Sequence, residues 1–152
     1  MTSYKELLAW QVARKLKDLV YRAVLQLPKN EEYALSSQMR RAVVSIGSNI
    51  AEGQGRGTIN DYIHFLYIAR GSAYELESQI IYCDDLHFLT QELSTELHDQ
   101  IRYDVYLINR LISALKRMLM YGKEASNRKQ EIDRQHYTIP NQRPKDKHCG
   151  KI

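Results

Sequence analysis

The chain has 152 residues, of which 43% are hydrophobic and 26% are charged, a composition typical of a single soluble domain. No apolar run approaches the ~20 residues that a membrane-spanning helix needs. Residues 1–6 contain no apolar signal-peptide core, so we expect a cytoplasmic protein.

The formal net charge of +4 is unevenly placed. Residues 1–121 carry 14 basic and 14 acidic side chains, whereas residues 122–152 carry 8 and 4. The folded body is therefore expected to be neutral overall.

Hydrophobic periodicity predicts two helices in the first third of the chain. The first opens with the capping-box pattern Ser3-x-x-Glu6 and ends at Pro28. Its apolar stripe consists of Leu8, Ala9, Val12, Ala13, Leu16, Leu19, Val20, Ala23, Val24 and Leu27. The second begins near Asn30 and is expected to stop at the glycines of residues 53–57. Its core row is Leu35, Met39, Ala42, Ile46 and either Asn49 or Ile50.

Two more helices follow the glycine run. The third begins at Thr58, with Asp61 in a capping-box position, and ends near His87. Its core row is Tyr62, Leu66, Ala69, Ala73, Leu76, Ile80 and Cys83. The fourth begins around Thr90 and follows the row Leu93, Leu97, Ile101, Ile108, Leu111, Ile112, Leu115 and Leu119. Asp104 interrupts this row, and we expect Val105 to take its place.

These elements predict an all-α fold. No segment alternates with period two, so no sheet is expected. Short connections make sequential helices antiparallel neighbours. We therefore expect residues 1–121 to form an antiparallel up-down-up-down four-helix bundle. Residues 122–152 have few apolar side chains, two prolines and mixed charge, which predicts a disordered basic tail.

The chain carries no motif that predicts catalysis, a metal site or a cofactor. The glycine run at residues 53–57 lacks the preceding strand of a phosphate-binding loop, so a helix end and turn is the better interpretation. None of the five histidines has a partner at His-x-x-x-His or Glu-x-x-His spacing. Cys83 and Cys149 fit neither a metal motif nor a disulfide framework. We expect a protein that is not an enzyme.

A polar seam is expected between the second and third helices. Small residues at 69–73 would let a neighbouring helix come close, and charges at a close seam are costly unless they are paired. The expected seam residues are Arg41, Asn49, Glu52, Arg70 and Glu75, with Arg41 paired to Glu75 and Arg70 to Glu52. Direct RNA contact by Arg40, Arg41 or Arg70 is the first alternative, and catalysis is the second.

The first helix carries aromatic and basic residues on its non-core side. Trp10, Arg14, Lys17 and Tyr21 line this face. A tryptophan that faces out of a small bundle needs a reason. A contact between protomers, made by Trp10 and Tyr21, is the preferred interpretation. Stacking of Trp10 on RNA bases beside the flanking cations, or ordinary local packing, are the alternatives.

Two stretches of the chain carry a family resemblance. They read Gln-x-Arg-Arg-Ala…Ser-Ile…Asn-Ile-Ala-Glu-Gly at residues 38–53 and Phe-Leu…Ala-Arg-Gly-Ser…Glu-Leu-Glu at residues 65–77. With Trp10, this pattern resembles the four-helix-bundle family encoded within intervening sequences of bacterial 23S ribosomal RNA genes. Gly47-Ser48 departs from the Pro-Ala that this family often has. Relatives include the accessory variability protein of diversity-generating retroelements, which looks like a five-fold ring that binds nucleic acid and a reverse transcriptase.

The resemblance implies a pentameric scaffold that binds RNA or DNA and serves a reverse transcriptase. The basic side chains expected to contact nucleic acid are Arg14, Lys17, Arg40, Arg128, Lys129, Arg143, Lys145 and Lys147. The alternative function is a protein–protein adaptor for a neighbouring enzyme, without nucleic-acid binding of its own. No membrane partner is expected.

Overall fold

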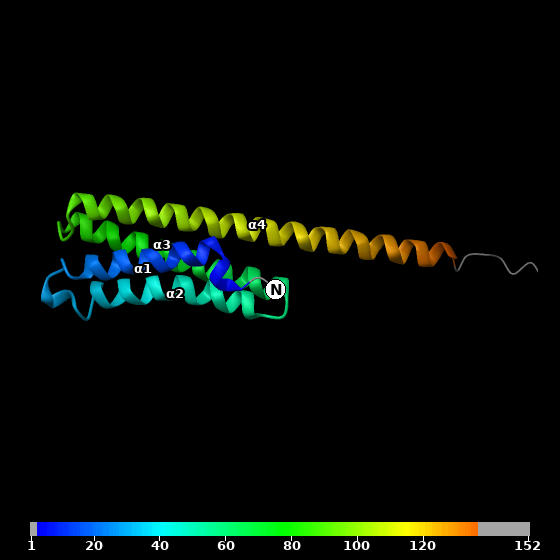
Figure 1. Ribbon diagram of the computed structural model, residues 1–152, viewed down its shortest axis with the longest axis horizontal. Coiled ribbons are helices and arrows are strands. Elements are labelled where there is room, and N and C mark those ends of the chain that lie inside the picture. The colour runs from blue at the N-terminus through cyan, green and yellow to red at the C-terminus, as the bar shows by residue number, and fades with distance from the viewer. Residues whose placement is uncertain (1–2, 137–152) are drawn as a thin grey trace, which may run out of the picture. The chain divides into compact units, whose positions relative to one another are not determined.

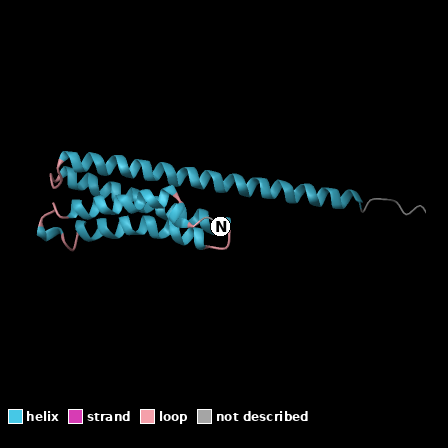
Figure 2. Cartoon of the chain, viewed as in Figure 1, coloured by secondary structure: helices cyan, strands magenta, loops and turns pink. Residues whose placement is uncertain are grey.

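The computed structural model describes residues 3–136, with side chains described for residues 3–132. Its elements are two short 3-10 helices, η1 (Tyr4–Glu6) and η2 (Lys29–Glu31), and four α-helices. The α-helices are α1 (Leu8–Val24), α2 (Leu35–Gly55), α3 (Ile59–Asp85) and α4 (Gln91–His136). The described part contains helices and loops and no strand (Figure 2), which confirms the all-α prediction.

The described part of the chain divides into two compact units, the first ending at Arg117 and the second beginning at Met118. Within the first unit the four helices form the predicted bundle, with successive helices side by side (Figure 1). Side-chain contacts give the antiparallel order. Gln26, just after α1, accepts a hydrogen bond from the backbone N–H of Thr90, just before α4, at 3.0 Å. Arg70 of α3 reaches Asn109 of α4 at 2.8 Å.

The helix boundaries follow local capping chemistry. Thr58 caps α3 as predicted: its hydroxyl accepts from the Asp61 backbone N–H at 3.1 Å and donates to the Asp61 carboxylate at 2.7 Å. Ser3 instead caps η1, where it accepts from Lys5, and α1 starts only at Leu8. Residues 29–31 form η2 rather than the first turn of the second helix, so α2 begins later than expected, at Leu35.

The predicted apolar rows supply most of the core. The largest side chains that are fully buried include Leu16, Met39, Ile46, Leu66, Leu76, Ile80, Leu97 and Ile101. Leu8 is an exception, because it is half exposed at the first turn of α1. Burial of each large apolar side chain contributes about 1.5–3 kcal/mol to folding. The four stripes together therefore account for why this chain closes into a bundle.

Asp104 is buried, contrary to the sequence prediction. It lies on the core row of α4 between Ile101 and Ile108 and is 0% exposed, whereas Val105 is only partly buried. The spacing of its neighbours fixes the face of a helix, and one polar residue cannot rotate that face. Neither carboxylate oxygen finds a hydrogen-bond partner among the described residues. Burial raises the pKa of the Asp104 carboxyl from 3.8 to about 7.

Two glycines have roles different from those expected. Gly53 was predicted to stop α2, but it is buried inside the helix, where it packs against α3. A Cβ at this position would lie 2.9 Å from Tyr62 Cδ2 and from Phe65 Cβ. Gly71 was expected to admit a neighbouring helix, but a Cβ there would meet nothing within 4 Å. The close contact between these helices therefore depends on Gly53 and not on Gly71.

Helix α4 continues past residue 121, where the bundle was expected to end. Residues 122–136 are helical, so the expectation of a tail without structure from residue 122 is wrong for this part. Strong helix formers such as Lys123, Glu124 and Ala125 occupy this segment. The segment contains no proline, and the next proline in the sequence is Pro140. Glu124 and Arg128 also form an i,i+4 ion pair at 3.8 Å. Residues 137–152 lie outside the described part. Among the helices that are described, none combines the length and apolarity needed to cross a membrane.

Candidate nucleic-acid interface

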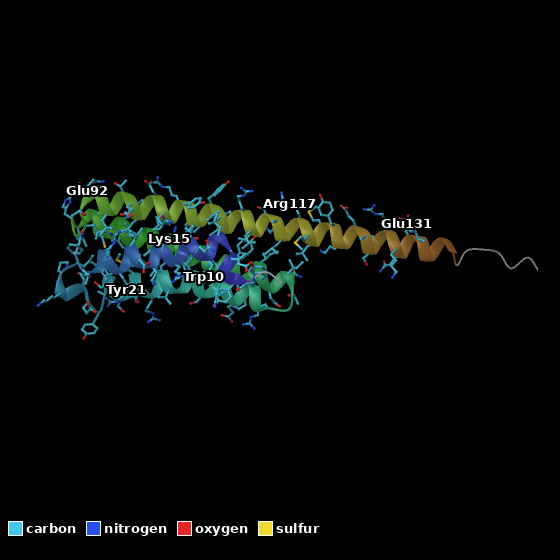
Figure 3. The ribbon with its side chains drawn as sticks, in the orientation of Figure 1. Trp10, Lys15, Tyr21, Glu92, Arg117 and Glu131 are labelled. Atoms are coloured by element: carbon cyan, nitrogen blue, oxygen red, sulfur yellow. The ribbon has the colours of Figure 1, made fainter. Side chains whose placement is uncertain are left out.

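A cationic groove lies at the N-terminal end of α1. Its volume is about 780 Å³, and it is lined by Lys5, Trp10, Gln11, Arg14, Lys15 and Asp18. The lining contains three cations and one carboxylate, so the net charge of the groove is positive. Trp10 and Lys15 both come from α1, as Figure 3 shows, and Lys5 comes from η1. The groove therefore combines an aromatic side chain with cations, a pairing that is common in sites for single-stranded nucleic acid.

Trp10 is held in place by contacts on several sides. The ring of Tyr4 meets it edge-on, with the ring centroids 5.2 Å apart. The Arg14 guanidinium lies over it, 5.8 Å from the ring centroid. On the α2 side, a Cβ added to Gly47 would lie 3.8 Å from Trp10 Nε1, which is ordinary packing distance. η1 is tied to α1 by the Gln11 side chain, which donates to the Lys5 carbonyl at 2.9 Å.

The four residues predicted to share one face of α1 do not form a single surface in the structure. Trp10 and Arg14 line the cationic groove, as described above. Lys17 lies outside it and pairs with Asp18 at 2.9 Å. Tyr21 lines a second groove near the other end of α1, and Figure 3 shows how far it lies from Trp10. Sequence reasoning missed Lys5, because only the position of η1 brings this residue beside α1. It also missed Lys15, which directly follows Arg14 in α1.

The second groove lies along α2. Its volume is about 570 Å³, and it is lined by Tyr21, Gln38, Arg40, Arg41, Ala42, Val44, Ser45 and Glu75. Arg40, a predicted nucleic-acid contact, pairs with Glu32 at 2.6 Å. Arg41 and Glu75 line the same groove, but no ion pair joins them. The predicted pairing of these two residues is therefore wrong.

Hydroxyl and amide groups form the polar seam between α2 and α3. Ser45 Oγ and Ser72 Oγ lie 2.9 Å apart across the two helices, and Ser72 donates to the Ile68 carbonyl at 3.1 Å. Asn49, a predicted seam residue, donates to the Ser45 carbonyl at 2.8 Å and to Ser45 Oγ at 3.0 Å. This chain of neutral hydrogen bonds joins the helices where ion pairs were expected.

The second predicted cross-helix ion pair is also wrong. Glu52 pairs with Arg56, one turn further along the chain. Arg70 donates to Asn109 of α4 at 2.8 Å, so it joins α3 to α4 and not to α2. Local partners at i,i+4 and a neighbour on the next helix satisfy these charges more directly.

Aromatic and basic side chains form two further groups, one between α3 and α4 and one along α4. The Tyr67 ring has the Arg70 guanidinium 4.8 Å from its centroid and the Lys116 ammonium 5.4 Å from it. On α4 the rings of Tyr103 and Tyr106 stack with centroids 6.4 Å apart, and Arg110 lies over Tyr106. Sequence reasoning missed both groups, although the Tyr67–Arg70 and Tyr106–Arg110 spacings place each pair on one helix face.

The remaining predicted contacts lie toward the C-terminus. Arg128 is in α4, where it pairs with Glu124, and Lys129 is exposed on the same helix. Arg143, Lys145 and Lys147 lie outside the described residues.

The described residues contain no group of three or more His, Cys, Asp or Glu side chains placed to hold a metal ion. Their one His–Asp contact, His98 Nε2 to Asp84 Oδ2 at 2.9 Å, ties the start of α4 to the end of α3. This contact has a structural role in fixing the turn between the two helices.

Comparison with known proteins places the chain in a family. A crystal structure of a protein of unknown function from the S23 ribosomal protein family of Bacteroides thetaiotaomicron matches it with a TM-score of 0.64. That match has 22% sequence identity and covers 69% of this chain and 98% of the other. No protein with a curated description matches. Residues 5–110 match the family described as 23S rRNA-intervening sequence protein. This chain belongs to the 23S rRNA-intervening sequence protein family.

Proposed function

We propose that this protein is a non-enzymatic scaffold that binds single-stranded RNA in the cationic groove of α1. The observation that carries the proposal is the combination of Trp10 with Lys5, Arg14 and Lys15 in one concave site. Stacking of one base on an aromatic side chain contributes about 1–3 kcal/mol, and every base offers a face for it. Cations beside the ring provide contacts for phosphates, whose counterions are released on binding.

The proposal includes assembly into a homo-oligomer, a pentamer by the sequence resemblance. Several copies of one weak groove would act together on one RNA and raise the affinity through effective concentration. Exposed cations of α4, such as Arg128 and Lys129, would add phosphate contacts. DNA is the alternative nucleic acid, and a reverse transcriptase is the class of protein partner that the resemblance implies.

The groove is tested by removing its cations together. We expect Lys5→Gln/Arg14→Gln/Lys15→Gln to weaken binding of a labelled single-stranded oligouridylate in fluorescence anisotropy. Three lost phosphate contacts should reduce the log–log salt slope by roughly 2. The matched control is Lys17→Gln/Arg22→Gln/Arg102→Gln, which removes the same charge outside the groove. If the two triple variants lose RNA affinity equally, the loss comes from the change in net charge alone. That result would contradict a site specific to the groove.

The proposed assembly is tested by sedimentation velocity. We expect the wild-type chain to sediment as a homo-oligomer, and Trp10→Ala to shift the distribution toward monomer, because Trp10 is the expected contact between protomers. Tyr33→Ala is a suitable control, because Tyr33 is 96% exposed in the loop before α2. A wild-type chain that sediments as a monomer even at high concentration would contradict the oligomer.

An adaptor function is the second candidate, and the outer face of α3 favours it. Ile68, Tyr74, Ile81 and Tyr82 are each at least 40% exposed there and share neighbouring rows of the helix. Uncharged aromatic and aliphatic side chains are typical of the core of protein interfaces. If oligouridylate does not bind even at low salt, the adaptor replaces RNA binding as the proposed function.

A further inference from the structure

The groove along α2 presents two opposite charges that are not paired with each other. Arg41 comes from α2 and Glu75 from α3, and both line the groove. Arg41 makes no ion pair or hydrogen bond with any residue in the described part of the chain, whereas its neighbour Arg40 is held by Glu32. A guanidinium and a carboxylate are thus both available to a ligand in one concave site.

The carboxylate is oriented by a buried neighbour. Gln79 is 7% exposed, and its side-chain N–H donates to Glu75 Oε1 at 3.2 Å. A carboxylate has about four acceptor positions, so this bond leaves the other oxygen free. Tyr21, whose side chain is partly exposed, gives the groove an aromatic wall. The site therefore offers donors, acceptors and a flat apolar surface together.

A ligand that matches this set has adjacent acceptor and donor edges on one flat ring. We propose that the groove binds a guanine base. Arg41 donates to O6 and N7, Glu75 accepts from N1–H and the 2-amino group, and Tyr21 contacts the ring face. This inference rests on the proposed RNA-binding function and deepens it: the α1 groove binds strand and bases without preference, and the α2 groove selects guanine.

The other bases fit the same groups less well. Adenine presents its 6-amino donor near Arg41 and its N1 acceptor near Glu75, so donors meet donors and acceptors meet acceptors. Cytosine has the same mismatch. Uracil offers O4 as an acceptor to Arg41 and N3–H as a donor to Glu75. It lacks a second acceptor in the place of guanine N7 and a second donor in the place of the guanine 2-amino group. The expected order of affinity is therefore guanine, then uracil, then adenine and cytosine.

The test measures mononucleotide binding to the full chain by isothermal titration calorimetry. Guanosine monophosphate should bind at least about tenfold more tightly than adenosine monophosphate, the discrimination expected of one good bidentate contact. Inosine monophosphate lacks the 2-amino group and should fall between them. Arg41→Gln and Glu75→Gln should each bring the guanosine affinity close to the adenosine value. The matched controls Arg102→Gln and Glu92→Gln, both exposed on α4, should keep the preference.

Equal affinities for the two nucleotides would overturn the inference, and a preference that survives both groove variants would overturn its assignment to Arg41 and Glu75. The α1 groove is tested by the loss of oligouridylate binding in Lys5→Gln/Arg14→Gln/Lys15→Gln, and the α2 groove is tested by the preference for guanosine over adenosine monophosphate, so the two proposals fail separately. Oligouridylate binding without a guanine preference leaves only the RNA-binding proposal. A guanine preference without oligouridylate binding contradicts that proposal and assigns the α2 groove to a free nucleotide.

Discussion

Asp104→Asn should remove a pH dependence of stability of about 4 kcal/mol between pH 4 and pH 8. The folded pKa of about 7 lies well above the ordinary value of 3.8, so the folded chain binds this proton more tightly than the unfolded chain. Stability from this group is therefore lost as the pH rises through this window. The size follows from about 1.36 kcal/mol for each unit of pKa difference.

Urea unfolding followed by circular dichroism, repeated across this pH range, measures the effect as a difference between two proteins. The free energy of unfolding of Asp104→Asn relative to wild type should rise steadily with pH, because all other groups titrate alike in both chains. Asp99→Asn is the matched control, since its side chain is 69% exposed on the same helix. A difference between Asp104→Asn and wild type that stays constant with pH would mean that the buried carboxyl is hydrated or paired in solution.

Gly53→Ala should destabilise the bundle, although alanine is the better helix former. The added Cβ would lie 2.9 Å from two side-chain atoms of α3 and 3.2 Å from the Tyr62 carbonyl oxygen. Backbone cannot move aside as a flexible side chain can, so α2 and α3 would have to separate. Overpacking of this kind costs about 1–3 kcal/mol.

Gly71→Ala is the matched substitution in open space, on a helix that shares the same interface. There the gain in helix propensity, up to about 1 kcal/mol, is not opposed by a clash. The Tm measured by thermal unfolding should therefore be higher for Gly71→Ala than for wild type, and lower for Gly53→Ala than for wild type. The reverse order would show that α2 and α3 do not approach as closely as the structure has them.

Much of the fold could be predicted because it depends on local rules. Apolar residues three and four apart determine which face of each helix is buried, and Thr58 with Asp61 marks the start of α3 from side-chain chemistry alone. The same rule explains the error at Asp104. Its position was set by Ile101 and Ile108, so it is buried whatever its own polarity.

The candidate site could be predicted only in part, because its geometry depends on contacts between elements. Trp10 and Arg14 are four residues apart, so their proximity followed from the helix period. Lys5 joins them only because η1 lies beside α1. The pairing of Arg41 with Glu75 was wrong because residues on facing rows still need a matching register and side-chain direction, which the sequence does not provide.

The most direct test of RNA binding at the α1 groove uses Trp10 as its own reporter. Trp10 is the one tryptophan of the chain, so fluorescence excited at the long-wavelength edge of tryptophan absorption, where the eleven tyrosines absorb little, reports on this groove. Titration with oligouridylate at low salt should give a saturable change in this fluorescence, which added salt reverses and which Lys5→Gln/Arg14→Gln/Lys15→Gln greatly weakens. Oligouridylate that binds by anisotropy but leaves the fluorescence unchanged would place RNA elsewhere on the molecule and contradict the proposed site.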